Sequence, residues 1–306
     1  MKKDLSYHIH NVIPYINWVY FFHAWGFPPF CAQIAEIHAC PACRRGWLQN
    51  LPDADQTKAE AAIPLFDDAI RCLNDLDSSH HAYVRFALLK AVSRDEDIIV
   101  TTEDEGTKVV LPFLRQQQTP QKEAPNLCLS DFIRPEGSGQ SDTIGLFAAT
   151  IKENKPTVCR SDDPYRNMLI QTLCDRLAEA TTEKMHEDVR KTYWGYAADE
   201  NLSIKELLNE RFQGIRPAIG YPSLPDQSLI FLIDDLLDMK GIGIRLTENG
   251  AMTPHATVCG LMFAHPQARY FGIGKIGEDQ LADYARRRGL PTQTLRKFLT
   301  SNLITS

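Results

Sequence analysis

The sequence predicts an α+β fold in which an antiparallel sheet is flanked by helices. Two observations support this prediction. Short segments rich in β-branched and aromatic residues gather in two parts of the chain, and longer segments with helical spacing surround them. The expected strands are joined by tight hairpins and short connections, which favour antiparallel pairing over a doubly wound parallel sheet.

The N-terminal third is expected to be mainly helical. Residues 9–25 are apolar and aromatic, which fits either a buried arm or a short helix. In residues 54–76 the apolar side chains recur every three or four positions, which is typical of a helix. Pro64 falls inside that pattern and predicts either a kink or a later helix start, because proline cannot continue the hydrogen bonds of a helix interior.

The middle of the chain changes to strand patterns. Strands are expected at residues 83–89, 97–100, 108–111 and 144–149, with a turn at 103–106 joining the second and third as a hairpin. Residues 116–124 are polar and predict a surface loop. Further strands are expected around residues 242–245, 256–263 and 270–275, and helices at 226–239, 278–288 and 291–299.

The longest expected helix covers residues 163–193. Leu169, Leu173 and Leu177 stack on one face. The opposite flank carries acids four residues apart, namely Asp175, Glu179, Glu183 and Glu187. Like charges at this spacing repel each other, so the acidic ridge is either solvated or has a member turned toward a ligand.

Composition excludes several classes of function. The 306 residues include 43% hydrophobic and 24% charged side chains, and the net charge is −6. These values are typical of a globular protein and argue against a nucleic-acid partner, which requires a basic face. The start, Met1-Lys2-Lys3-Asp4, does not lead into an apolar signal core, and no segment is as long as a membrane span. We therefore expect a cytoplasmic protein without a membrane partner.

One cysteine cluster stands out among the eight cysteines. His38, Cys40 and Cys43 follow one another closely, and Cys31 lies upstream. Together they could supply four zinc ligands, although a second, cleanly spaced ligand pair is lacking. A redox pair or a plain thiol-bearing loop fits the same residues.

The segment Gly214–Pro222 carries the most information about function. Its two glycines and two prolines exclude a helix or a central strand and predict a stiff loop that holds Arg216 and Tyr221. A guanidinium fork and a flat phenol ring suit a charged, ring-bearing ligand, whereas a structural turn is the alternative. No dinucleotide fingerprint, P-loop, nucleophile elbow or zinc-protease motif accompanies it.

Several motifs together resemble the activation domain of cobalamin-dependent methionine synthase. The Arg-x-x-x-Gly-Tyr-Pro signature of that family is met by Arg216, Gly220, Tyr221 and Pro222. Residues 191–202 match directly upstream. Shorter matches run in order from about His8 onward, at 15–18, 114–117, 129–132, 176–180, 246–248, 265–266 and 283–287. The resemblance implies one curved domain over residues 1–306, with residues 1–50 as an N-terminal arm that carries the Cys-rich insert.

The resemblance also implies a function and a set of site residues. The family binds S-adenosylmethionine, whose methyl group restores cobalamin after its cobalt has been oxidised to Co(II). Arg216 would bind the methionine carboxylate and the backbone near Ala218 would meet the adenine. Further contacts are implied for Gly220, Tyr221, Glu179, Tyr270 and, in place of the usual aspartate, Asn17. Phe271 stands where the family has a second tyrosine.

The partners follow from the same resemblance. The chain lacks the homocysteine, folate and cobalamin modules of the family and any cobalt-ligating histidine motif. We therefore expect it to act in trans on a cobalamin-binding methionine synthase subunit, with a flavodoxin-like or other electron donor. The alternative is a non-catalytic module that binds a corrinoid protein through a relaxed pocket, which the residues Asn17 and Phe271 would favour.

Overall fold

The computed structural model describes residues 1–102, 106–118, 124–154 and 162–304. These residues form a six-stranded antiparallel sheet, in the order β4-β3-β2-β5-β8 with β1 also paired to β2. Its strands are β1 (Lys2–His8), β2 (His80–Arg94), β3 (Asp97–Thr101), β4 (Lys108–Pro112), β5 (Asp142–Glu153) and β8 (Thr257–Met262). The short strands β6 (Arg245–Leu246) and β7 (Met252–Thr253) form a separate pair. The predicted α+β class and antiparallel pairing are confirmed.

The long strand β2 organises the sheet. Along one edge it pairs first with β1, from His8 opposite His81 to Lys2 opposite Ala87, and then with β3 from Lys90 onward. Its other edge pairs with β5 over twelve residues. The sequence did not predict β1, because most of its side chains are exposed and show no clear alternation of buried positions. Main-chain hydrogen bonding to β2 holds this strand in place.

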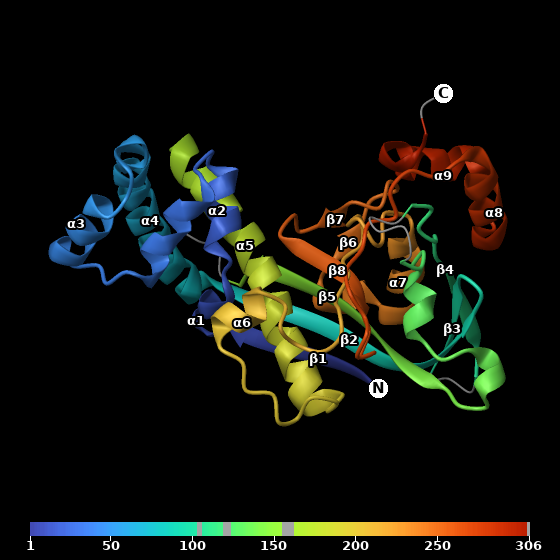
Figure 1. Ribbon diagram of the computed structural model, residues 1–306. Coiled ribbons are helices and arrows are strands. Elements are labelled where there is room, and N and C mark those ends of the chain that lie inside the picture. The colour runs from blue at the N-terminus through green and yellow to red at the C-terminus, as the bar shows by residue number, and fades with distance from the viewer. Residues whose placement is uncertain (103–105, 119–123, 155–161, 305–306) are drawn as a thin grey trace.

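Helices gather at both ends of the sheet (Figure 1). At one end lie α1 (Ile9–Val12), α2 (Trp18–Ala24), α3 (Pro41–Gln49) and α4 (Asp53–Ser79); at the other lie α8 (Glu278–Arg288) and α9 (Thr292–Phe298). The aromatic opening of the chain thus forms short helices, one of its two expected structures. Pro64 lies within α4, so the expectation of a later helix start is wrong.

The two faces of the sheet are covered by different helices. The helix α5 (Pro164–Asp188) continues into a π-helical turn, η5 (Val189–Tyr193), which confirms the long helix expected there. Met185 of α5 and Val189 of η5 pack in one core cluster with Phe147 of β5. The helix α7 (Leu229–Leu237) packs with the alternate residues of β5, such as Leu146, on the opposite face. The middle of β5 therefore buries both sets of its side chains, as a strand covered on both faces must.

Some local expectations are wrong. Residues 270–275 form no strand, and the strand expected at 242–245 begins only at Arg245, because a 3₁₀ turn, η6 (Met239–Ile242), precedes it. Gln116 is buried rather than part of a surface loop: its amide donates to the Gly272 carbonyl at 2.8 Å and its side-chain oxygen accepts from Leu127. Residues 103–105 of the expected hairpin turn and 119–123 of the expected loop lie outside the described residues. A last helix, α6 (Ile204–Leu208), lies in the connection between η5 and α7.

Candidate ligand-binding cleft

A cleft of about 550 Å³ lies between α5 and the Gly214–Pro222 loop. Tyr20 of α2 and Val258 of β8 complete its walls. Five of the predicted site residues line it, namely Arg216, Ala218, Tyr221, Glu179 and Tyr270. The structure therefore brings together residues from three distant parts of the sequence, and the volume is that of a site for a small molecule.

The loop is held in place by β8. Ile215 and Phe263 exchange main-chain hydrogen bonds of 2.9 and 3.0 Å, and the Leu261 amide donates to the Pro217 carbonyl at 3.0 Å. Gly214 has a φ of +87°, and a Cβ at this position would lie 2.2 Å from the Phe263 carbonyl oxygen. Only glycine fits such a close approach of two backbones. Because Ile215 is buried in the core, the next side chain, Arg216, is directed toward the cleft.

The guanidinium of Arg216 is held by two residues of α5. Nη2 donates to Glu183 Oε1 at 2.6 Å, and Nη1 donates to Oε2 at 3.3 Å. Nη1 also donates to Nδ1 of His186 at 3.2 Å. The Arg216 side chain is only 10% exposed. Burial alone would lower its pKa, but the charge and hydrogen bonds of Glu183, together with Tyr270 and Glu210, outweigh this effect, and the pKa of Arg216 is raised.

His186 connects Arg216 to the segment that precedes the loop. An arginine can only donate, so His186 Nδ1 accepts and the ring proton lies on Nε2. Complete burial, together with the charges of Arg216 and Arg190, lowers the pKa of His186 well below its usual value and keeps the ring neutral. Nε2 lies 3.5 Å from the hydroxyl of Tyr196, which donates to the Gln213 carbonyl at 3.3 Å. The tautomer of His186 is therefore linked, through Tyr196, to the backbone that leads into the loop.

The acids of the α5 ridge are partly buried and paired rather than fully solvated. Each acid is half-buried and bonded to a partner: Asp175 to His255, Glu179 to Arg176, Glu183 to Arg216 and Glu187 to Tyr15. Of these acids, Glu179 and Glu183 line the cleft, where Glu210 joins them. Burial raises the pKa of both Glu179 and Glu210, and the nearby charge of Glu183 raises both further. Sequence reasoning had singled out only Glu179 as a site residue.

Two other predicted ligand contacts lie beside the cleft rather than on its wall. Asn17 caps α2, where its side chain accepts from the Val19 amide at 3.1 Å. Gly220 has a φ of +84° and its amide donates to the Leu224 carbonyl at 2.9 Å, so it shapes the turn that carries Tyr221. Neither is among the residues that line the cleft. Their contact with a ligand stays a prediction.

The cysteine cluster lies apart from the cleft. His38, Cys40 and Cys43 come together at the start of α3, whereas Cys31 is fully buried and does not join them. The main-chain hydrogen bond from Cys43 and the contact with His38 lower the pKa of Cys40 to about 6. None of these residues lines the cleft.

The fold and the cleft together define a small-molecule-binding protein, an antiparallel α+β domain with an acidic cleft beside a Pro/Gly loop. A family model for the vitamin B12 dependent methionine synthase activation domain matches residues 8–289, and the chain belongs to this family. Its fold is similar to the crystal structure of the MetH reactivation domain bound to AdoHcy, with a TM-score of 0.83 and 34% sequence identity. That match covers 100% of this chain and 91% of the other.

Among the described residues, no helix is both long enough and apolar enough to cross a membrane.

Proposed function

We propose that this chain binds S-adenosylmethionine in the cleft and takes part in reactivating a cobalamin-dependent methionine synthase in trans. The observation that carries the proposal is the meeting of Arg216, Tyr221 and the α5 acids in one cleft. Membership of the activation-domain family and the AdoHcy-bound structural neighbour support it. We propose that a partner subunit carries the cobalamin and that a flavodoxin-like or other donor supplies the electron.

The donors of Arg216 fit a ligand carboxylate. A guanidinium has five N–H groups, and Glu183 and His186 take three hydrogen bonds from Arg216. The remaining donors can bind the carboxylate of the methionine moiety, while Glu183 fixes the orientation of the planar group. Tyr270 adds to this frame, because its hydroxyl accepts from the Arg216 amide at 2.9 Å.

The charge of the cleft fits a cationic ligand. Three carboxylates line it, those of Glu179, Glu183 and Glu210, against the two cations Arg176 and Arg216. This excess of acid favours a ligand that carries a positive sulfonium. When bound, S-adenosylmethionine would supply the methyl group from that sulfonium, and the neutral thioether left behind is a good leaving group. The chain's own residues then act by binding and orientation.

Calorimetric titration with S-adenosylmethionine tests the binding step. We expect the native protein to bind and Arg216→Ala to bind about 100-fold more weakly, because charge-assisted hydrogen bonds to a buried ligand contribute about 1.5–3 kcal/mol each. Arg245→Ala is the matched control, since Arg245 is an exposed arginine of β6 outside the cleft. Native protein that does not bind, or equal affinity after Arg216→Ala, would refute the assigned site.

Reconstitution tests the action in trans. The protein is mixed with a Co(II)-loaded cobalamin subunit, a reductant and S-adenosylmethionine, and the return of methyl transfer is followed. We expect activity to return only when this chain is present. Tight binding to the cobalamin subunit without any return of activity would favour the alternative, a non-catalytic corrinoid-binding module.

A further inference from the structure

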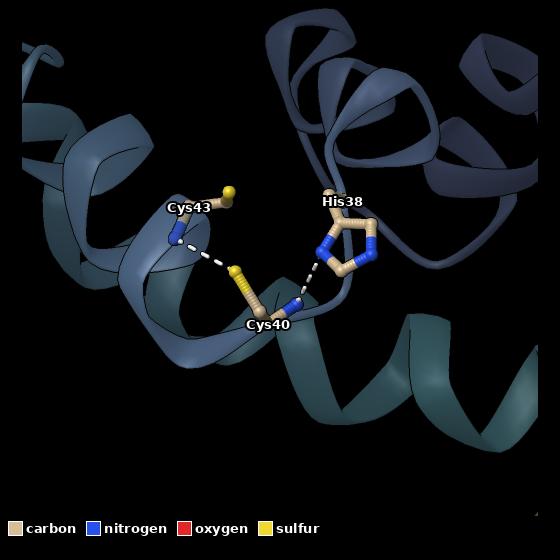
Figure 2. Close-up of side chains that lie close together, drawn as sticks. All are labelled: His38, Cys40 and Cys43. Carbon is tan, nitrogen blue, oxygen red and sulfur yellow. Dashed lines mark hydrogen bonds between the residues drawn. The ribbon is translucent and has the colours of Figure 1, made fainter.

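Three side chains with metal-binding atoms meet where the chain enters α3. The ligand atoms of His38, Cys40 and Cys43 all lie within 4.8 Å of one another (Figure 2). Main-chain hydrogen bonds hold this arrangement: the Cys40 amide donates to His38 Nδ1 at 3.3 Å, and the Cys43 amide donates to Cys40 Sγ at 3.4 Å. These bonds place the imidazole beside Cys40. Because an imidazole nitrogen has one lone pair, a metal bound at Nδ1 would replace its hydrogen bond from the Cys40 amide.

These cysteines differ from the buried cysteines of the chain. Cys31, Cys72, Cys128 and Cys259 are buried, as is usual for cysteines that act as small hydrophobic side chains. By contrast, Cys43 and His38 are exposed, and Cys40 is half-buried. Packing in the core therefore does not account for the motif. Two thiolates and one imidazole are the ligand set that zinc prefers, whereas magnesium and calcium prefer oxygen.

The helix that starts at this motif is thinly attached to the rest of the protein. Of its nine residues only Trp47 is buried. Its Nε1 donates to Gln33 at 3.2 Å, and Arg44 donates to both oxygens of Asp67 in α4 at 2.5 and 2.7 Å. A metal ion held by the preceding His38 and by the first turn of α3 would tie the start of the helix to the segment before it, next to the ion pair of Arg44.

We propose that His38, Cys40 and Cys43 bind one zinc ion that fixes the start of α3. The two thiols release their protons to solvent on binding, and no electron transfer is involved. No fourth histidine, cysteine or carboxylate of the described residues belongs to the group, so one coordination position is left for water or another external ligand. Figure 1 places α3 at the outer end of the N-terminal helices. None of the three ligands lines the cleft, so the zinc is independent of ligand binding there.

One other group of possible ligands provides an internal control. His8, His10 and Asp77 also lie together, but the main chain and Nδ1 of His10 both bond to Asp77. Hydrogen bonds between His10 and Asp77 already account for this second group. The variant His10→Ala thus removes a histidine from it and leaves the cysteine motif intact.

The experiment measures zinc in the full chain purified without chelator, by elemental analysis. We expect one zinc per chain in the native protein and in His10→Ala, and at least a tenfold lower content in Cys40→Ser and Cys43→Ser. Adding Zn²⁺ alone to the metal-free protein should raise its melting temperature, and this rise should be absent in Cys40→Ser. Loss of zinc in His10→Ala but not in Cys40→Ser would overturn the assignment.

Cobalt substitution keeps the test valid if a cysteine variant fails to fold. Co²⁺ added to the metal-free native protein should give a sulfur-to-metal charge-transfer band and the intense visible absorption of a four-coordinate ion. Absence of these bands, or a Cys40–Cys43 disulfide in the freshly purified protein with no bound metal, would overturn the proposal. Neither result bears on the titration with S-adenosylmethionine, so the two proposals fail separately.

Discussion

The buried ion pair between Arg190 and Glu200 gives the sharpest stability prediction. The Arg190 side chain is 1% exposed and that of Glu200 is 8% exposed. Nε and Nη2 of Arg190 donate to the two carboxylate oxygens at 3.0 and 2.5 Å, and the guanidinium stacks on Phe212 at 4.2 Å. Arg190 Nη1 is buried and finds no hydrogen-bond partner within the part of the chain that the structure describes. Removing Glu200 would therefore leave a buried cation that has lost its only carboxylate partner among the described contacts.

We expect Glu200→Ala to cost about 3–5 kcal/mol of unfolding free energy, the cost of breaking a buried pair from one side. With an unfolding entropy of about 2.1 cal/mol/K per residue over 306 residues, this is a fall of about 5–8 °C in melting temperature. Differential scanning calorimetry measures it directly.

The double variant Arg190→Met with Glu200→Ala serves as the control. It removes both charges and keeps an apolar side chain against Phe212, so we expect it to be more stable than Glu200→Ala alone. A melting temperature for Glu200→Ala within about 1 °C of the native protein would refute the reasoning, as would a double variant less stable than the single one.

Three further predictions concern the loop and its support. Gly214→Ala should destabilise the protein by several kcal/mol in urea unfolding, because the new Cβ would meet the Phe263 carbonyl oxygen at 2.2 Å and the φ of +87° strains any other residue. The folded state holds His186 neutral, so below about pH 6.5 the unfolded state binds more protons than the folded state. The free energy of unfolding therefore decreases as the pH is lowered, by up to about 1.4 kcal/mol per pH unit. His186→Gln should flatten that slope in melting curves from pH 5 to 7.5. Tyr270→Phe removes the acceptor of the Arg216 amide and should cost about 1 kcal/mol in the same unfolding assay, whereas an unchanged stability would show that water replaces it.

The parts of the fold that periodicity encodes were predictable. The helix α5 follows from apolar spacing, α8 and α9 were also expected, and the pairing of β3 with β4 follows from two β-rich runs a few residues apart. Strand pairing that depends on main-chain hydrogen bonds produces no periodic pattern in the sequence. The strand β1 is mostly exposed and was missed, while residues 270–275 have β-like composition but pair with no neighbouring strand. Whether a β-rich run becomes a strand depends on the edge it meets.

The candidate site was predictable only where a local motif marks it. The loop composition identified Arg216 and Tyr221, and the resemblance identified Glu179 and Tyr270. The partner of Arg216 was not identified, because Glu183 is one of four equally spaced acids and only the tertiary structure places it opposite the loop. His186 and Glu210 could not be identified either, because no local motif marks them and only the tertiary structure brings them to Arg216 and the cleft.

The structure also explains why residues 191–202 resemble the family although they do not line the cleft. Glu200 binds Arg190 at the end of the long helix, and Tyr196 lies between His186 and the Gln213 carbonyl. These contacts support the helix residues that hold Arg216 and the backbone that leads into its loop. The segment therefore acts on the cleft through packing and hydrogen bonds. It follows that Glu200→Ala should weaken binding of S-adenosylmethionine even at temperatures where the protein remains folded, since the support of Arg216 is loosened before the domain unfolds.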